Sequence, residues 1–287
     1  MDALFGPAGN SEDFYASGYK ATVQAPAYLH EKGLTAYEIQ FGRGVSMGRE
    51  TAEKLGENAL LHGVALSVHA PYYISLASAE EEKRQNSVRY IVESAQAAHW
   101  CGAKRIVVHP GGLGGLSRES ACILAKETLA QALNELREKG FDDIILCPET
   151  MGKINQLGNL DEVLSFCLLD ESMLPCVDFG HLNSRTGGGL KTRDDMRRVL
   201  QKIADVLGED RAKRFHIHFS KIEYSKGGEK RHLTFEDTEF GPDPEMLLDV
   251  IVERCAHPVI ICESAGTQAA DAAQMMEYYR KNRGFGI

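Results

Sequence analysis

A regular alternation of short apolar runs and longer amphipathic segments extends along the chain and limits the folds open to it. Most runs are about 5–8 residues long and rich in Val, Ile and Phe, which is typical of buried parallel strands. The segments between them carry helix signals: the capping residue Ser117 precedes the acid Glu119, and Pro244 follows Asp243. Eight strands, each followed by a helix, are predicted at residues 3–6, 36–41, 65–70, 105–110, 143–150, 174–181, 214–220 and 258–264.

Alternating strand–helix units indicate a parallel sheet with right-handed crossovers. Eight units in a chain of 287 residues favour a closed barrel, whose typical length is about 250 residues. An open doubly wound sheet is the alternative, but FGPAG at the first predicted strand lacks the GxGxxG phosphate turn. No linker or repeat divides the chain. We therefore predict an α/β fold, a single (β/α)8 TIM barrel over residues 1–287, with a functional or mobile long loop at 221–242.

Composition and charge restrict the class of protein. The chain carries 41 acidic and 32 basic residues, and its net charge of −9 argues against coating nucleic acid through overall charge. Its seven cysteines include no CxxC pair, so we expect buried thiols in a reducing compartment. The first residues lack the features of a signal peptide, and no run approaches about 18 apolar residues. We expect a cytoplasmic monomer with no membrane partner.

Polar residues stand at the carboxyl ends of six consecutive predicted strands, where barrel enzymes keep their chemistry. They are His69, His109, Glu149, Asp178 with His181, His216 with His218, and Glu263. Converging carboxylates repel one another unless a cation neutralises them. Imidazoles and carboxylates without thiolates are a ligand set for Zn, Mn or Fe and disfavour a structural zinc. The pattern predicts a metal site at the barrel mouth, and a bridging carboxylate indicates more than one ion.

Five segments carry a family resemblance: SVHAPYYISLAS, RIVVHPGG, ILCPET, CVDFGH and VIICES. In this order, over about residues 60–265, they resemble the endonuclease IV family of apurinic/apyrimidinic endonucleases. The resemblance implies a barrel whose mouth holds three zinc ions and that cleaves the DNA backbone 5′ to a lost base. It also implies that the partner is DNA containing abasic sites and that the process is DNA repair.

The resemblance assigns roles to individual residues. His69, His109 and Glu149 would hold one zinc, and Glu149 would bridge to a second ion. Asp178, a strand-seven histidine and Glu263 would complete the second site. Glu149 and Glu263 are accordingly the predicted catalytic residues. The predicted cofactor is Zn²⁺, as two or three ions, with Mn²⁺ as an alternative.

Two histidines are candidates for the metal ligand from strand seven. HFSK resembles the family's HLND when His218 is aligned, while His216 points to the same face two residues earlier. The local pattern favours His218, and both are retained as candidate ligands.

The third zinc site departs from the family pattern. His181 would help hold this ion, and the family usually adds an Asp-x-His pair from the loop after strand seven. Here the stretch runs from Glu229 to His232, so His232 fits but Lys230 stands where Asp is expected. Either Glu229 replaces the aspartate, or the third metal is weak or absent. The family's amino-terminal GxHxSxxGG motif is missing as well, which indicates a divergent member.

Three rim residues are candidates for binding DNA. Tyr72 and Tyr73 follow the HAP motif, where the family has a loop that enters the duplex, although ordinary packing at the rim is the alternative. Arg43 lies in a partly recognisable DNA-contacting loop after the second strand. Because the net charge opposes DNA, binding would depend on local bases such as Arg43, Lys221 and Arg231.

A rival function belongs to another enzyme class. Glu149, Asp178, His218 and Glu263 also resemble the metal site of sugar isomerases and epimerases of the xylose isomerase-like superfamily, where one Mn or similar ion binds the sugar. The additional histidines favour a multi-zinc phosphoesterase, while the missing loop aspartate and the acidic charge favour the sugar enzyme. A barrel that binds metal but has lost catalysis is a third reading. The predicted function is a zinc-dependent, endonuclease IV-like hydrolase that cleaves DNA at abasic sites.

Overall fold

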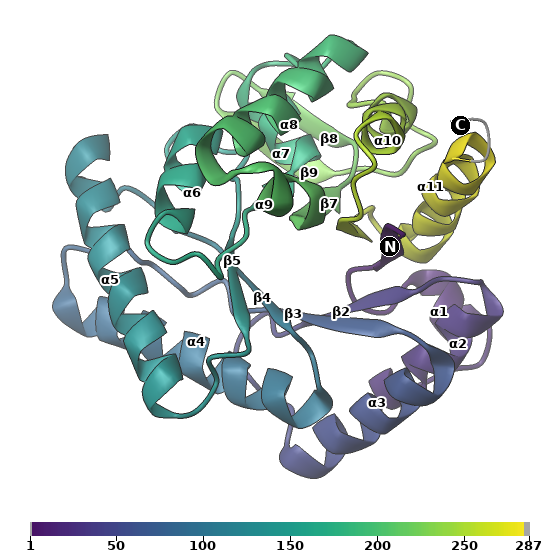
Figure 1. Ribbon diagram of the computed structural model, residues 1–287, viewed down its shortest axis with the longest axis horizontal. Helices are drawn as coiled ribbons and strands as arrows, with labels where there is room; N and C mark the ends of the chain where they lie inside the picture. Colours follow the sequence, from purple (N-terminus) through teal and green to yellow (C-terminus); the bar gives the residue numbers. More distant parts are fainter. Residues whose placement is uncertain (1, 284–287) are drawn as a thin grey trace.

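The computed structural model describes residues 2–283, which form a ring of eight parallel strands surrounded by helices (Figure 1). One half of the ring has the strand order β1 (Leu4–Pro7), β10 (Val259–Cys262), β7 (His216–Phe219) and β6 (Cys176–Asp178). The other half runs through β2 (Ala36–Gln40), β3 (Ala65–His69), β4 (Arg105–Val108) and β5 (Ile145–Pro148).

Single parallel bridges close the ring where the two halves meet. Ala8 pairs with Glu38 between β1 and β2, and Glu149 pairs with Cys176 between β5 and β6. The N–H of Thr150 donates to the Cys176 carbonyl at 3.0 Å at the second junction. Closure removes the free edges of the sheet. The predicted (β/α)8 TIM barrel is therefore confirmed, and residue 1 and residues 284–287 of the predicted domain lie outside the described residues.

A main helix covers the barrel after each strand: α2 (Ala25–Glu31), α3 (Arg49–His62), α4 (Glu81–Cys101), α5 (Arg118–Glu138), α6 (Leu160–Cys167), α8 (Arg193–Leu207), α10 (Pro244–Glu253) and α11 (Gln268–Arg283). The predicted start signals are confirmed, because the Ser117 side chain caps α5 and the Asp243 side chain caps α10. Among residues 2–283, no helix combines the length and apolar character needed to cross a membrane.

Short elements that the sequence reading did not predict lie in the connections: α1 (Glu12–Ala16), the 3-10 turn η1 (Thr22–Gln24), α7 (Phe179–Arg185) and α9 (Glu209–Arg214). The predicted strand 174–181 is therefore wrong beyond Asp178, because α7 begins at Phe179. The cause is local: the Asp178 carboxylate accepts a hydrogen bond from the N–H of His181 at 2.7 Å and caps the helix.

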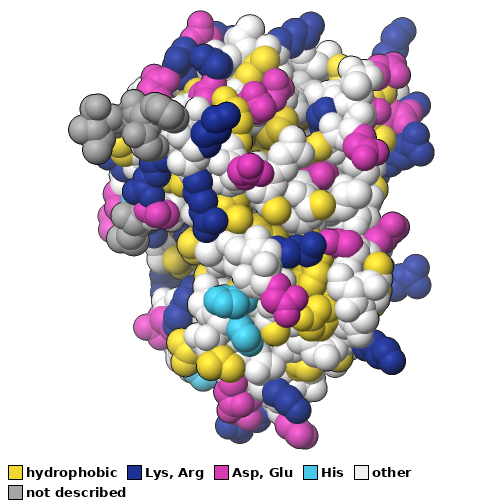
Figure 2. All heavy atoms as spheres, turned by 90° about the vertical axis from the view of Figure 1, so that its right-hand side faces the viewer, with side chains coloured by type: hydrophobic (Ala, Val, Ile, Leu, Met, Phe, Trp, Pro, Cys, Tyr) yellow, Lys and Arg dark blue, Asp and Glu magenta, His cyan; other side chains and the backbone are white. Residues whose placement is uncertain are grey.

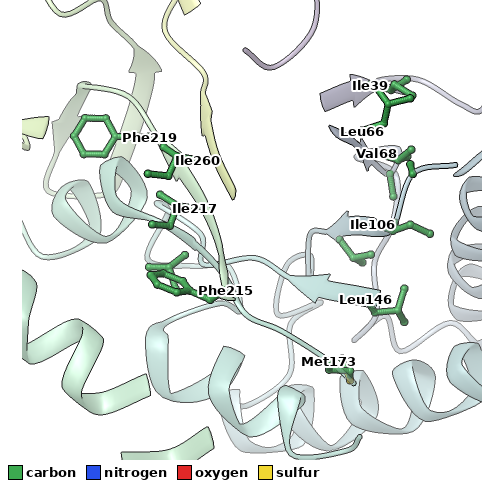
Figure 3. Close-up of a cluster of buried hydrophobic side chains, with 14 of the residues drawn as sticks. Ile39, Leu66, Val68, Ile106, Leu146, Met173, Phe215, Ile217, Phe219 and Ile260 are labelled. Atoms are coloured by element: carbon green, nitrogen blue, oxygen red, sulfur yellow. The ribbon is translucent and has the colours of Figure 1, made fainter. Parts of the chain in front are cut away.

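Side chains alternate between the two faces of each strand. Ile39, Val68 and Ile217 belong to the buried apolar layer between strands and helices (Figure 3). Their neighbours in the same strands, among them Glu38 and His218, face the barrel interior and are buried as well. This alternation gives the barrel an apolar outer layer and a partly polar interior below the mouth.

The long segment 221–242 contains an antiparallel hairpin made of β8 (Ile222–Ser225) and β9 (Gly228–His232). The Lys221 ammonium group donates to the carbonyl of Phe235 at 2.8 Å and also contacts the carbonyl of Asp237. Lys221 therefore holds the loop in place. Its ammonium group is occupied by these carbonyls, so its position does not support the expectation that Lys221 contacts DNA at the rim.

Candidate metal centre

The polar residues predicted from the strand ends converge at one end of the barrel, except for His216. Among the described residues, five groups of His, Cys, Asp or Glu each offer one ligand atom per residue within 4.8 Å of the others. Two of these groups are His69 with His218 and Glu263, and Cys176 with His216 and His218. The other three are the clusters considered below. The first cluster is His69, His109 and Glu149; the second is Glu149, Asp178, His218 and Glu263; the third is His181, Glu229 and His232.

The first cluster is built from the ends of β3, β4 and β5. Nε2 of His69 lies 3.2 Å from Oε2 of Glu149, and Nε2 of His109 lies 3.0 Å from the same oxygen. Nδ1 of His69 is 2.8 Å from the carbonyl oxygen of Ala70, to which it donates. Because that hydrogen bond places the ring proton on Nδ1, the lone pair of Nε2 is free, as it must be in a histidine that binds metal through Nε2.

The second cluster shares Glu149 with the first. Oε1 of Glu149 lies 3.3 Å from Nδ1 of His218, and that nitrogen lies 3.4 Å from Oε1 of Glu263. Glu149 is fully buried, so both of its oxygens face protein groups. Its two oxygens thus point to different clusters, which is the geometry of a carboxylate able to bridge two cations.

Asp178 carries one carboxylate oxygen of the second cluster that no described protein group satisfies. Its Oδ2 is buried and has no hydrogen-bond partner in the part of the chain that the structure describes. The nearest imidazole nitrogen, Nδ1 of His181 at 3.3 Å, donates instead to the Thr150 carbonyl at 2.9 Å. Burial and the charges of Glu263 and Glu149 raise the pKa of Asp178 to about 6. A divalent cation fits this site, because an unpaired buried carboxylate is costly.

Protonated imidazoles balance the buried charge without a metal. Burial works against ionised Glu149, yet the charges of His109 and His218 hold its pKa well below its usual range. Burial likewise opposes the imidazolium of His181, but the charges of Asp178 and Glu149 raise the pKa of His181 to about 10. Divalent ions supply the same positive charge, so the residues present fit the metal that the sequence predicts.

The third cluster joins α7 to the hairpin. Nε2 of His181 lies 3.4 Å from Oε2 of Glu229, and Nε2 of His232 lies 3.9 Å from its Oε1. Nδ1 of His232 is 2.8 Å from the hydroxyl of Ser220, which leaves Nε2 to face the cluster. The Lys230 ammonium is 3.0 Å from Glu223 and takes no part.

A β-bulge explains why Glu229 can stand in for the expected aspartate. Residues three apart face opposite sides of a regular strand. In β9, however, Arg231 pairs with Glu223 and Glu229 pairs with Tyr224, so Lys230 is an extra residue in the ladder. The bulge returns Glu229 and His232 to the same face. The sequence reading left Glu229 as one of two options because spacing alone does not reveal a bulge.

Close backbone contact brings the hairpin to the site. The N–H of Glu229 donates to the carbonyl of Gly152, in the loop after β5, at 3.3 Å. A Cβ at Gly152 would lie 2.6 Å from Cβ of Glu229 and 2.8 Å from the hydroxyl of Ser184. Gly152 therefore permits Glu229 to reach the third cluster.

His216 is the predicted candidate that lies away from the mouth. It is two residues deeper in β7, with Nε2 3.0 Å from Oε2 of Glu38. A guanidinium nitrogen of Arg105 lies 3.5 Å from its Nδ1, and that fixed positive charge opposes a cation there. Burial lowers the pKa of His216 to about 4, so it is neutral. His218, favoured by the sequence pattern, is the strand-seven histidine that faces the carboxylates.

Glu38 is a residue that the sequence analysis missed. Its side chain is fully buried inside the barrel, between His216 and His218. Burial opposes its charge, but the charge of His218 and the hydrogen bonds of His216 and His218 hold the pKa of Glu38 well below its usual range. The available signal was a single glutamate at an inward-facing position of the apolar run AYEIQF.

The predicted DNA-binding residues lie at the rim. Tyr72 and Tyr73 are each 56% exposed in the loop after β3, which excludes packing in the core as their main role. The N–H of Tyr72 donates to the carbonyl of Gly42 at 3.1 Å, beside the exposed Arg43. Arg231, in contrast, is paired with Glu223 at 2.8 Å. The two tyrosines and Arg43 thus belong to neighbouring loops.

Comparison with known proteins identifies the family. Residues 26–282 match the family described as Xylose isomerase-like TIM barrel. The chain belongs to this family. An uncharacterized protein of Methanocaldococcus jannaschii is 35% identical over 281 residues, 97% of each chain. A probable endonuclease 4 of Shouchella clausii is 28% identical over 221 residues, 73% of each chain.

Solved structures of two kinds share the barrel. Endonuclease IV from Thermus thermophilus has a TM-score of 0.67 at 20% identity and covers 98% of each chain. A D-tagatose 3-epimerase-like protein has a TM-score of 0.69 at 18% identity, over 88% of this chain and 90% of its own. The predicted resemblance to endonuclease IV is confirmed as that of a divergent member of a wider family of enzymes. Because both an endonuclease IV and an epimerase-like protein have this barrel, the fold alone does not decide between the two chemistries, and the site must be used for that.

Proposed function

We propose that this protein is a zinc-dependent phosphodiesterase that cleaves DNA 5′ to abasic sites. The observation that carries the proposal is the third cluster of His181, Glu229 and His232, beside two clusters that share Glu149. A sugar isomerase needs the second cluster alone, whereas a phosphodiester hydrolase uses several ions to clamp the attacking and departing oxygens. The first and third clusters have no role in the sugar reaction.

The three clusters define which residues would hold each ion. His69 and His109 would bind one ion with Glu149, and Glu149 would share the next with Asp178, His218 and Glu263; His181, Glu229 and His232 would hold the third. Bound zinc supplies a hydroxide nucleophile near neutral pH and positive charge for the phosphate. The carboxylates position these charges, and Glu149 keeps the first two clusters at a fixed separation.

The rim residues would select the substrate. A nucleotide without a base leaves the helical stack at low cost, so a deep mouth can accept it. The exposed rings of Tyr72 and Tyr73 would occupy the gap in the duplex, since aromatic and apolar side chains insert between base steps. Arg43, exposed in the adjacent loop, would contact a backbone phosphate.

The net charge, and the one face seen from the side of α10 and α11, favour a local contact with DNA. The face that includes α10 and α11 carries acidic and basic side chains interspersed, without a continuous basic stripe (Figure 2). The net charge of −9 repels DNA at long range, so affinity depends on local contacts at the rim. Recognition of a local lesion fits this distribution better than wrapping of a long duplex.

A nicking assay tests the proposed reaction. Zinc-loaded protein is incubated with a duplex that carries one tetrahydrofuran abasic analogue, and the expected product is a chelator-sensitive nick 5′ to the lesion. His232→Ala removes a member of the third cluster and should abolish the nick. His99→Ala, on α4 against Phe141, is the matched control and should cut normally. An uncut lesion duplex with fully metal-loaded protein would contradict the proposal.

The second candidate function is sugar isomerisation or epimerisation with one Mn²⁺ ion. It is favoured by the second cluster, where Asp178 and Glu263 accompany Glu149 and His218 around one point. The same preparation loaded with Mn²⁺ and supplied with free ketoses distinguishes the two functions. Interconversion of a ketose without nicking would establish the sugar reaction.

A further inference from the structure

A buried polar network lies inside the barrel beneath the candidate metal centre. Glu38 in β2 accepts a hydrogen bond from the hydroxyl of Ser67 at 2.9 Å and from the Gln40 amide at 3.1 Å. Its Oε2 lies 3.0 Å from Nε2 of His216, and its Oε1 lies 2.9 Å from Nε2 of His218. The proposed reaction makes no use of Glu38, although burying a carboxylate in a barrel interior is expensive.

His218 connects this network to the mouth. Its Nδ1 faces the carboxylates of Glu149 and Glu263 at 3.3 and 3.4 Å. Its Nε2 points the other way, toward Glu38, and has no aligned hydrogen-bond partner in the described range 2–283. The ring therefore has one nitrogen at the second cluster and the other beside a carboxylate. A histidine that binds metal commonly donates its second N–H to such a carboxylate, which fixes the tautomer and raises ligand basicity.

The geometry points to Glu38 as the positioning residue for the second ion: it holds the proton of His218 on Nε2, so that the Nδ1 lone pair faces Glu149, Asp178 and Glu263. His216 and Ser67 hold the other oxygen of Glu38 and keep its carboxylate plane fixed. Glu38 itself is one residue layer below the mouth and contacts none of the mouth carboxylates. This inference rests on the proposed metal centre and adds a part to it that binds no ion.

Cadmium substitution tests the inference site by site. Wild-type protein loaded with ¹¹³Cd should give a separate resonance for each occupied cluster. Glu38→Gln keeps the size of the side chain but removes its charge, and it should weaken the second site about 10–100-fold, as removal of an outer-sphere partner typically does. After dialysis against a graded chelator, that variant should lose the second-site resonance first and keep the third-site resonance. His218→Ala identifies the second-site resonance.

Two matched variants separate positioning from general damage. His99→Ala, on α4 against Phe141, leaves the Glu38 network untouched, so all resonances should persist. Glu38→Asp keeps the charge and should restore part of the second-site affinity. Equal loss of all resonances in Glu38→Gln, or retention of all of them, would overturn the inference.

The wild-type protein gives an independent reading that does not depend on a variant folding. In zinc-loaded protein with ¹⁵N-labelled histidine, His218 should carry its proton on Nε2 and its metal on Nδ1. A proton on Nδ1 would overturn the inference while leaving the metal centre intact. Failure of the wild-type chain to bind any divalent ion would instead contradict the proposed function on which the inference rests.

Discussion

Glu149 occupies the position on which most of the centre depends. Its Oε2 faces His69 and His109, and its Oε1 faces His218 and His181. A side chain with both oxygens committed in this way has no role in packing alone, because an apolar residue would fill the same space at lower cost.

Glu149→Gln should therefore lose about two of the ions together with activity, because a neutral amide cannot offset two dications. Mass spectrometry of the dialysed protein measures the metal content. His99→Ala, remote from the mouth, should keep the wild-type content. A Glu149→Gln protein that retains all its zinc would show that this residue bridges nothing.

His181 predicts how metal uptake depends on pH. Its pKa is about 10 in the folded metal-free chain, above the ordinary 6.5, so its imidazolium stabilises the fold fully below about pH 6.5 and this contribution is lost as pH rises through about 10. Metal must displace that proton at neutral pH. Zinc affinity should rise about tenfold per pH unit for each proton displaced.

Proton release on zinc addition, followed in weakly buffered solution at pH 7.5, measures this coupling. His181→Ala should release about one proton fewer than the wild type. Zinc affinity that is the same at pH 6 and pH 8 would rule out protonated His181 as the group that the metal replaces.

The hairpin β8–β9 is the element that completes the third cluster, and it marks the limit of what the sequence reveals. The strand ends were predictable because each polar residue directly follows an apolar run, and parallel strands deliver their ends to one rim. The role of Glu229 could not be decided from the sequence, because the direction of its side chain depends on the bulge at Lys230 and hence on pairing with β8.

Glu38 was missed for a related reason. The sequence does not show that its side chain points into the barrel, because the barrel interior exists only once the eight strands have closed into a ring.

Gly152→Ala tests the docking of this hairpin. The new methyl group would collide with Glu229 and Ser184, so the third ion should be lost while the ions of the two clusters that contain Glu149 stay. Gly227→Ala, at the exposed hairpin turn, is the matched control. A Cβ at Gly227 would have its nearest neighbour, the hydroxyl of Ser225, at 3.9 Å, so this variant should keep the full metal content. Equal metal content in both variants would show that the hairpin position is not set by this contact.

The molecule as a whole is acidic, so the proposed contact with DNA must be local. Arg43→Ala should weaken binding to lesion duplexes of any sequence and reduce the salt dependence of log Kd by about one unit of slope, as loss of one phosphate contact does. Fluorescence anisotropy over a series of salt concentrations measures the slope. Arg89→Ala on α4, where the arginine lies beside Glu93, is the control. An unchanged slope in Arg43→Ala would remove Arg43 from the DNA interface.

A multi-ion phosphodiesterase and a single-ion sugar enzyme differ in the number of metal ions that each chain binds, and this number can be measured. Purified wild-type protein is offered zinc and manganese together, dialysed, and analysed by mass spectrometry. Three clusters, two of which share Glu149, predict close to three zinc ions per chain, falling to about two in His232→Ala. One manganese-like ion per chain, unchanged in His232→Ala, would contradict the proposed centre.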